Sequence, residues 1–205
     1  MFATIISSSK RVLLTALAGG LLASSFVLPL SAFAYQSGAK ITTAKGDIII
    51  YLYEKEAPIT VKNFKQLVER NFYSEGSMVF HRVVPGFVVQ TGDPTNTGTS
   101  GSGKTIPLEV RNSLYHNRAG MVAMARSSDP NSASSQFYIT LASQPALDGK
   151  YAIFGRVLKG IDVLPRIQQG DGMFGITLMD VEGIAPEKPV NPAPKTNLHK
   201  AFKKK

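Results

Sequence analysis

The chain has 205 residues, of which 43% are hydrophobic, enough for one compact domain. It has no cysteine, and His81, His116 and His199 lie far apart, so we expect no disulfide, thiol nucleophile, metal site or cofactor. Of the formal net charge of +9, two units come from Lys10 and Arg11 and five from residues 185–205, so the nearly neutral remainder predicts no nucleic-acid binding.

Residues 1–34 have the features of a signal peptide. Lys10 and Arg11 precede an apolar run over residues 12–30, and the small residues Ala32 and Ala34 flank Phe33 at the expected cleavage site. A mature chain beginning at Tyr35 would leave no membrane span. The alternative is an uncleaved membrane anchor, because the run is nearly long enough to cross a bilayer.

The segment from residue 40 predicts an antiparallel β structure of many short strands. Two hairpins are expected, one over residues 41–52 and one over residues 78–91 with a turn at Pro85-Gly86. A polar loop follows over residues 92–104. Four further strands are expected at residues 120–125, 136–140, 151–157 and 176–181.

Only two segments predict helices. Pro58 suits a first helical turn, and Val61, Phe64 and Leu67 follow at helical spacing, which predicts a helix over residues 58–70. A short second helix is expected over residues 161–168. Many strands with two helices indicate an antiparallel barrel or a sandwich.

Beyond residue 184 the apolar pattern ends. Residues 185–205 are rich in proline and lysine and predict an extended tail, which divides the chain into a leader (1–34), one domain (35–184) and this tail.

A glycine-rich segment over residues 98–105 matches the phosphate-binding pattern G-x-x-x-x-G-K-T. That loop must connect a buried strand to a helix whose N-terminal amides face the phosphates. Residues 106–112 after it are too short and too poorly patterned to form that helix. We therefore reject nucleotide binding.

Four sequence blocks stand out in order along the chain: FHRVVPGFVVQTGD at 80–93, GMVAMAR at 120–126, SSQFYI at 134–139 and LDGKYAIFG at 147–155. Together they resemble the signature of the cyclophilin family of peptidyl-prolyl cis-trans isomerases. The resemblance spans most of residues 41–184 and is closest to the exported bacterial members. It implies a mainly β fold, a closed eight-stranded antiparallel barrel capped by two α-helices. The sequence does not determine the oligomeric state, and a monomer is our default expectation.

Catalysis of proline isomerisation requires neither a nucleophile nor a proton transfer. Rotation about an X-Pro bond has a barrier of about 20 kcal/mol, and a donor aimed at the prolyl nitrogen lowers it once the amide loses planarity. Arg82 suits that role because it is always charged and forked. In a hairpin centred on Gly86, Arg82 lies opposite Gln90, while Phe87 offers an apolar wall. We therefore expect Arg82, Phe87 and Gln90 to be the catalytic residues.

The resemblance adds seven substrate-binding residues. It places Val88, Tyr138 and Leu147 in the proline pocket. It places Ala125, Arg126 and Gln136 along the bound peptide, and Tyr151 at the rim of the pocket. On sequence pattern alone these residues could equally be core or surface residues. His81 is expected to be a hydrogen-bonded structural histidine or a bystander rather than a base, and His116 to lie in a loop.

The sequence departs from the family pattern at four positions. Ala146 stands where many members carry an aromatic residue that contacts cyclosporin, so we expect weak or no cyclosporin binding. Tyr138 replaces the usual phenylalanine, and its hydroxyl must find a hydrogen-bond partner. Tyr151 and Arg126 replace a histidine and an asparagine.

The sequence thus predicts a periplasmic isomerase that accelerates X-Pro rotation in proline-containing polypeptides and assists the folding of exported proteins. The alternative is a binding module or chaperone that uses the same groove. The basic tail predicts peripheral association with anionic membrane surfaces.

Overall fold

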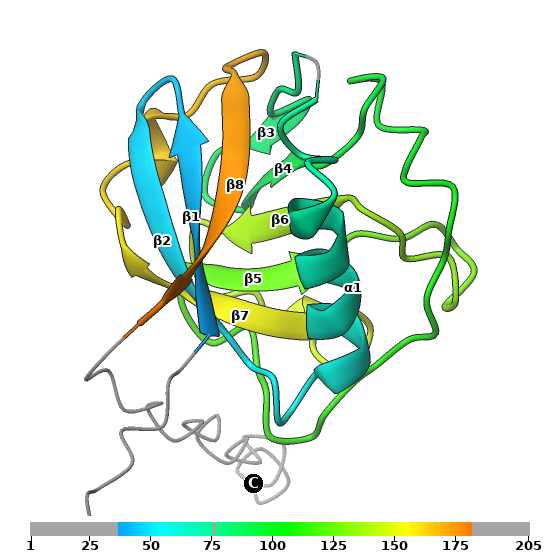
Figure 1. Cartoon of the computed structure of the whole chain (residues 1–205). Helices are drawn as coiled ribbons and strands as arrows, with labels where there is room; N and C mark the ends of the chain where they lie inside the picture. Colours follow the sequence, from blue (N-terminus) through cyan, green and yellow to red (C-terminus); the bar gives the residue numbers. More distant parts are fainter. Residues whose placement is uncertain (1–36, 76, 182–205) are drawn as a thin grey trace, which may run out of the picture. The chain divides into compact units, whose positions relative to one another are not determined.

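The structure is a computed structural model that describes residues 37–75 and 77–181 (Figure 1). The expected leader and the proline- and lysine-rich tail lie outside the described residues. None of the described helices is long and apolar enough to cross a membrane.

One eight-stranded antiparallel sheet forms the centre of the described fold, in the order β3-β4-β6-β5-β7-β2-β1-β8. The sequence predicted these strands, some with different ends. Their bounds are β1 Ser37–Thr43, β2 Gly46–Leu52, β3 Arg82–Val84, β4 Val88–Thr91, β5 Met121–Met124, β6 Phe137–Thr140, β7 Ile153–Lys159 and β8 Met173–Asp180.

Helix α1, Pro58–Glu69, confirms the predicted first helix. Proline is tolerated in its first turn because the N–H groups there have no partner within the helix. Phe64 on the buried face packs against Phe137 of β6 and Phe154 of β7, with ring centroids 5.8 and 5.1 Å away. Figure 1 shows the helix beside the ends of β5, β6 and β7.

The predicted second helix over residues 161–168 is wrong. The segment forms turns and one short 3₁₀ helix, η2, over Leu164–Arg166, and the N–H of Ile167 donates to the carbonyl of Leu164, three residues back. Pro165 explains the difference, because it has no N–H to donate and disfavours the α conformation of the residue before it. The apolar spacing reflects packing: Val163, Leu164 and Ile167 are buried.

The expected closed barrel is also wrong, because the sheet is a half-barrel with β3 and β8 as its end strands. The segments that precede these two strands meet through an isolated bridge, Val79 with Gly172, and a few backbone hydrogen bonds, such as that from the Met173 N–H to the Met78 carbonyl at 2.8 Å, rather than through a continuous ladder. The Asn96 side chain also pairs with this part of the chain: it accepts the N–H of Val79 and donates to the carbonyl of Ser77. Residues 78–81, predicted as strand, therefore have part of their backbone paired with a side chain, and β3 begins only at Arg82.

Two groups of buried apolar side chains stabilise the fold. The larger lies between α1 and the sheet. The smaller includes Val88, Ala123 and Tyr138, with Phe87 and Leu147 partly buried against it. Since the smaller group contains several predicted site residues, the same packing that stabilises this part of the sheet also shapes the site.

Candidate active site

The β3–β4 hairpin places Arg82 directly opposite Gln90. Gly86 has φ 71°, a backbone conformation that glycine adopts readily, and this allows the tight turn between the strands. Directly opposed residues project from the same face of an antiparallel pair, as the sequence predicted for this hairpin.

The Arg82 side chain is exposed but lies over the hairpin's own apolar residue. Its Cζ atom is 5.6 Å from the centroid of the Phe87 ring, within the range of a cation–π contact. The guanidinium is therefore held at the edge of an apolar surface, where it can donate to a bound group.

Arg82 and Phe87 belong to the lining of a cavity of about 180 Å³, called here the slot. The other residues that line it come from β4, β6, the loop after β5, the short 3₁₀ helix η1 (Pro145–Leu147) and the loop that follows η1. They are Val88, Gln90, Ala125, Arg126, Tyr138, Leu147 and Tyr151. Every predicted site residue except Gln136 therefore lies around this slot.

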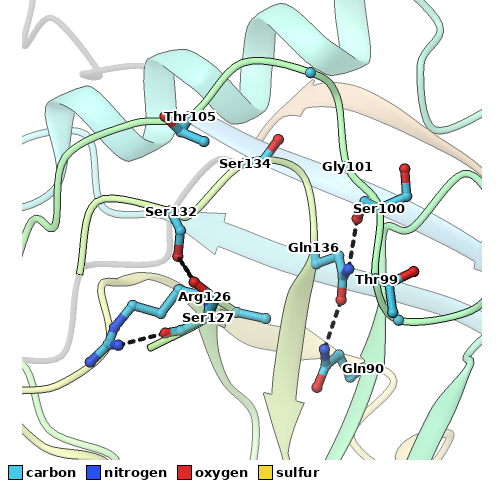
Figure 2. A pocket seen from close by; sticks show the side chains of 13 residues that line it. Gln90, Thr99, Ser100, Gly101, Thr105, Arg126, Ser127, Ser132, Ser134 and Gln136 are labelled. Carbon is cyan, nitrogen blue, oxygen red and sulfur yellow. Dashed lines mark hydrogen bonds between the residues drawn. The ribbon is translucent and has the colours of Figure 1, made fainter. Parts of the chain in front are cut away.

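Gln136 lines a neighbouring polar cavity of about 590 Å³, called here the hollow (Figure 2). The slot and the hollow share Gln90, Ala125 and Arg126, so they form one continuous site. The glycine-rich loop over residues 98–105 contributes to one wall of the hollow. The apolar side chains of Phe87, Val88 and Leu147 on the slot wall suit a small apolar ring, and the hollow continuous with the slot leaves room for an extended peptide.

A hydrogen-bond chain connects the loop to the slot (Figure 2). The side-chain N–H of Gln136 donates to the Ser100 carbonyl at 2.7 Å, and Gln90 donates to the Gln136 side-chain oxygen at 2.9 Å. The loop thus orients Gln90 beside Arg82, although Gln136 itself does not line the slot.

Asp93 anchors the glycine-rich loop. Its buried carboxylate accepts the N–H of Thr95 at 2.7 Å, the hydroxyl of Thr95 at 2.8 Å and the N–H of Ser100 at 3.2 Å. Burial raises the pKa of Asp93, but these hydrogen bonds outweigh it and lower the pKa to about 2. The loop runs on to an isolated bridge between Ile106 and Ala133 instead of a helix, which agrees with the rejection of a phosphate-binding loop.

The rim of the slot is formed by Tyr151 and Arg126. The Arg126 Cζ atom lies 4.9 Å from the Tyr151 ring centroid, and its Nε donates to the Lys150 carbonyl at 3.0 Å. Tyr151 meets Tyr138 edge to face at 5.8 Å. Tyr151 and Arg126, which the sequence analysis noted as departures from the resemblance, therefore contact each other.

His116 is the residue that sequence reasoning underestimated. It lies in a loop as expected, but its side chain is fully buried and its Nε2 atom is 3.0 Å from the Tyr138 hydroxyl. Burial lowers the pKa of His116, and Asp148 opposes that shift. The sequence offered one indication of this role: the hydroxyl of Tyr138 needed a hydrogen-bond partner.

His81, in contrast, lines neither the slot nor the hollow.

The sequence profile of the family described as "Cyclophilin type peptidyl-prolyl cis-trans isomerase/CLD" matches residues 39–183. Peptidyl-prolyl cis-trans isomerase-like 1 of Emericella nidulans is 47% identical over 128 residues, which cover 61% of this chain and 77% of the relative. Peptidyl-prolyl cis-trans isomerase ppi1 of Schizosaccharomyces pombe is 44% identical over 134 residues, covering 64% and 84%.

Solved structures are similar as well. A cyclophilin type peptidyl-prolyl cis-trans isomerase of Cryptosporidium parvum has a TM-score of 0.65 and 31% identity, covering 71% of this chain and 98% of that one. The same protein solved in the presence of the dipeptide ala-pro has a TM-score of 0.64 and 32% identity, covering 69% and 98%.

Proposed function

Because the chain belongs to the cyclophilin-type family and is a peptidyl-prolyl cis-trans isomerase acting on proline-containing peptides, we propose that Arg82 accelerates the rotation. The prolyl ring occupies the slot, and the Arg82 guanidinium donates to the prolyl nitrogen as the amide loses planarity. The donor acts only in the twisted state, so it lowers the barrier without tightening the ground state.

The observation that carries this proposal is the position of Arg82 over Phe87 and opposite Gln90, on the lining of one slot. Phe87, Val88, Tyr138 and Leu147 supply apolar surface that excludes water from the ring. Gln90, oriented by Gln136, is placed to hold a carbonyl of the peptide. The solved relative crystallised in the presence of ala-pro supports a proline-sized occupant.

Replacing Arg82 by alanine tests the role of the guanidinium. We expect Arg82→Ala to slow isomerisation of a short X-Pro peptide about a hundredfold in an NMR exchange assay, since loss of one transition-state donor has that effect. Peptide binding and the fold should survive. Arg166→Ala, which removes an exposed arginine far from the slot in sequence, is the matched control and should retain the wild-type rate.

An Arg82→Ala variant that isomerises the peptide as fast as wild type would refute the assigned mechanism. Such a result would mean that another group in the slot lowers the barrier. The second function considered above, in which the groove binds proline-containing segments and acts as a chaperone, would be favoured only if the wild type itself left the uncatalysed rate unchanged.

We further propose that the isomerase is exported and assists folding in the periplasm. Support comes from the positive charges at Lys10 and Arg11, the apolar run after them, and the small residues before Tyr35. N-terminal sequencing of exported protein should begin at Tyr35, whereas an intact Met1 in the membrane fraction would contradict cleavage.

The lysine-rich segment over residues 185–205 supports a peripheral association with anionic envelope surfaces, because clustered lysines are attracted to them. Such binding should be lost at high salt and on deletion of this segment. Fractionation that is unaffected by both changes would count against it.

A further inference from the structure

Three polar side chains from separate segments form one hydrogen-bond chain at the slot. The Asp148 Oδ1 atom lies 2.9 Å from Nδ1 of His116, and Nε2 of the same imidazole lies 3.0 Å from the Tyr138 hydroxyl. His116 is fully buried and Tyr138 is only 5% exposed, so solvent does not readily replace either partner.

The direction of each hydrogen bond follows from the chemistry of the groups. A carboxylate only accepts, and Asp148 accepts both the backbone N–H of His116 at 2.7 Å and the Nδ1 hydrogen. A neutral imidazole carries one N–H, so Nε2 must be the acceptor. The hydroxyl of Tyr138 therefore donates its single hydrogen to His116.

The chain connects two walls of the slot. Tyr138 on β6 is one wall, and Leu147, which directly precedes Asp148, is another. The carbonyl of His116 also accepts the N–H of Gln144 at 2.6 Å, so both ends of the short turn that carries Leu147 are attached to His116. The side chain and the backbone of His116 together therefore fix the distance between Tyr138 and Leu147.

We propose that His116 and Asp148 are positioning residues for the proline slot: they hold the Tyr138 hydroxyl as a donor pointing away from the bound ring and keep the ring of Tyr138 fixed as a slot wall. The inference rests on the proposed occupancy of the slot by proline. It gives the Tyr138 hydroxyl, an addition to the family pattern, a defined partner and orientation.

A consequence is that acid should weaken substrate binding. A protonated His116 donates from Nε2 to the Tyr138 oxygen, and the hydroxyl hydrogen must then turn elsewhere, including toward the apolar slot. Burial lowers the pKa of His116 and Asp148 opposes it, so the neutral form prevails at neutral pH. Asp148 and Tyr138 are the titratable groups that face the imidazole. Tyr151 and Arg126 at the rim interact electrostatically with the Tyr138 hydroxyl.

A double-mutant cycle separates this role from a merely structural one. Asp148→Asn can donate to Nδ1, which moves the imidazole hydrogen to Nε2 and reverses the bond to Tyr138. We expect Asp148→Asn to raise KM for a short X-Pro peptide about fivefold, the effect of roughly one hydrogen bond, with a smaller change in kcat.

In a Tyr138→Phe background, which has no hydroxyl to reorient, the same substitution should raise KM less than about twofold, because coupled residues are non-additive. The acid-dependent rise in KM should also be smaller in this background. Asp162→Asn, which removes an exposed carboxylate, is the matched control and should leave KM and kcat unchanged in both backgrounds. An equal effect of Asp148→Asn in both backgrounds would overturn the proposal.

Nitrogen-15 NMR of the His116 imidazole tests the chain without catalysis. At neutral pH the wild type should show a protonated Nδ1 and an unprotonated Nε2, and Asp148→Asn should shift hydrogen toward Nε2. A protonated Nε2 in the neutral wild type would overturn the inference. Failure of the Arg82 mechanism would instead appear as an unaffected rate in Arg82→Ala with this NMR pattern intact, so the two failures are distinguishable.

Discussion

At the residue scale, Ala146 stands where the resemblance described above leads us to expect an aromatic residue in many family members. It is exposed on η1, Pro145–Leu147, directly before the slot residue Leu147. A methyl group here offers neither ring surface nor an N–H donor to a bulky ligand. The rest of the slot does not depend on position 146, so peptide turnover and inhibitor binding should be separable.

Replacing Ala146 by tryptophan should therefore create cyclosporin affinity. An indole ring adds apolar contact and one N–H donor, and we expect binding to tighten at least about tenfold in a calorimetric titration. Ala146→Leu, which adds apolar surface without the donor, should give a smaller gain. Submicromolar inhibition of the wild type would contradict the expectation that alanine weakens binding.

At the element scale, helix α1 depends on a carboxylate from a distant loop. Ala57 at its N-cap offers no side-chain acceptor. Glu109 accepts instead the N–H groups of Ile59 at 3.2 Å and Thr60 at 2.8 Å, and also the Thr60 hydroxyl. The buried carboxylate thus satisfies donors that every helix leaves free in its first turn.

Replacing Glu109 by alanine should lower the free energy of unfolding by about 1–3 kcal/mol, because it leaves those buried donors without an acceptor. Glu109→Gln retains one acceptor oxygen and should lose less. Urea denaturation measures both. Glu69→Ala, at the exposed C-terminal end of the same helix, should change stability by less than about 0.5 kcal/mol; an equal loss there would refute the capping role.

At the scale of the whole molecule, stability in acid should depend on the buried carboxylate of Asp93. Its pKa is lowered to about 2 by hydrogen bonds that outweigh the effect of burial. A depressed folded-state pKa contributes stability that is complete above the unfolded value and is lost as pH falls through the folded one. The window therefore runs from about pH 4 down to about pH 2.

At neutral pH we expect Asp93→Asn to lower the free energy of unfolding by about 1–3 kcal/mol, because the charge-assisted hydrogen bonds are weakened. Urea denaturation should therefore show a lower midpoint for this variant than for the wild type. This difference should narrow as pH falls through the window above, when the wild-type carboxylate is protonated. Asp162→Asn should show little difference at any pH. A gap between Asp93→Asn and wild type that stays constant with pH would show that the charge of Asp93 is not responsible.

The sequence predicted most of the elements because their signals are local. Alternation of apolar residues and turn chemistry specify strands such as β1 and β2, and the turn at Gly86 also sets the pairing of Arg82 with Gln90. The motif blocks in turn predicted the residues around the slot. Where the local signal was ambiguous, as over residues 161–168, apolar spacing indicated burial correctly but the wrong secondary structure.

The sequence by itself therefore determined the strands, the first helix, the family and the Arg82 hairpin. Only the tertiary structure decided that Asn96 pairs with the backbone ahead of β3, that Glu109 caps α1, and that His116 connects Tyr138 to Asp148. Each of these depends on side chains 17 to 50 residues apart along the chain. Sequence periodicity indicates which face of an element is apolar, but it does not indicate which distant polar group accepts a hydrogen bond from a buried donor.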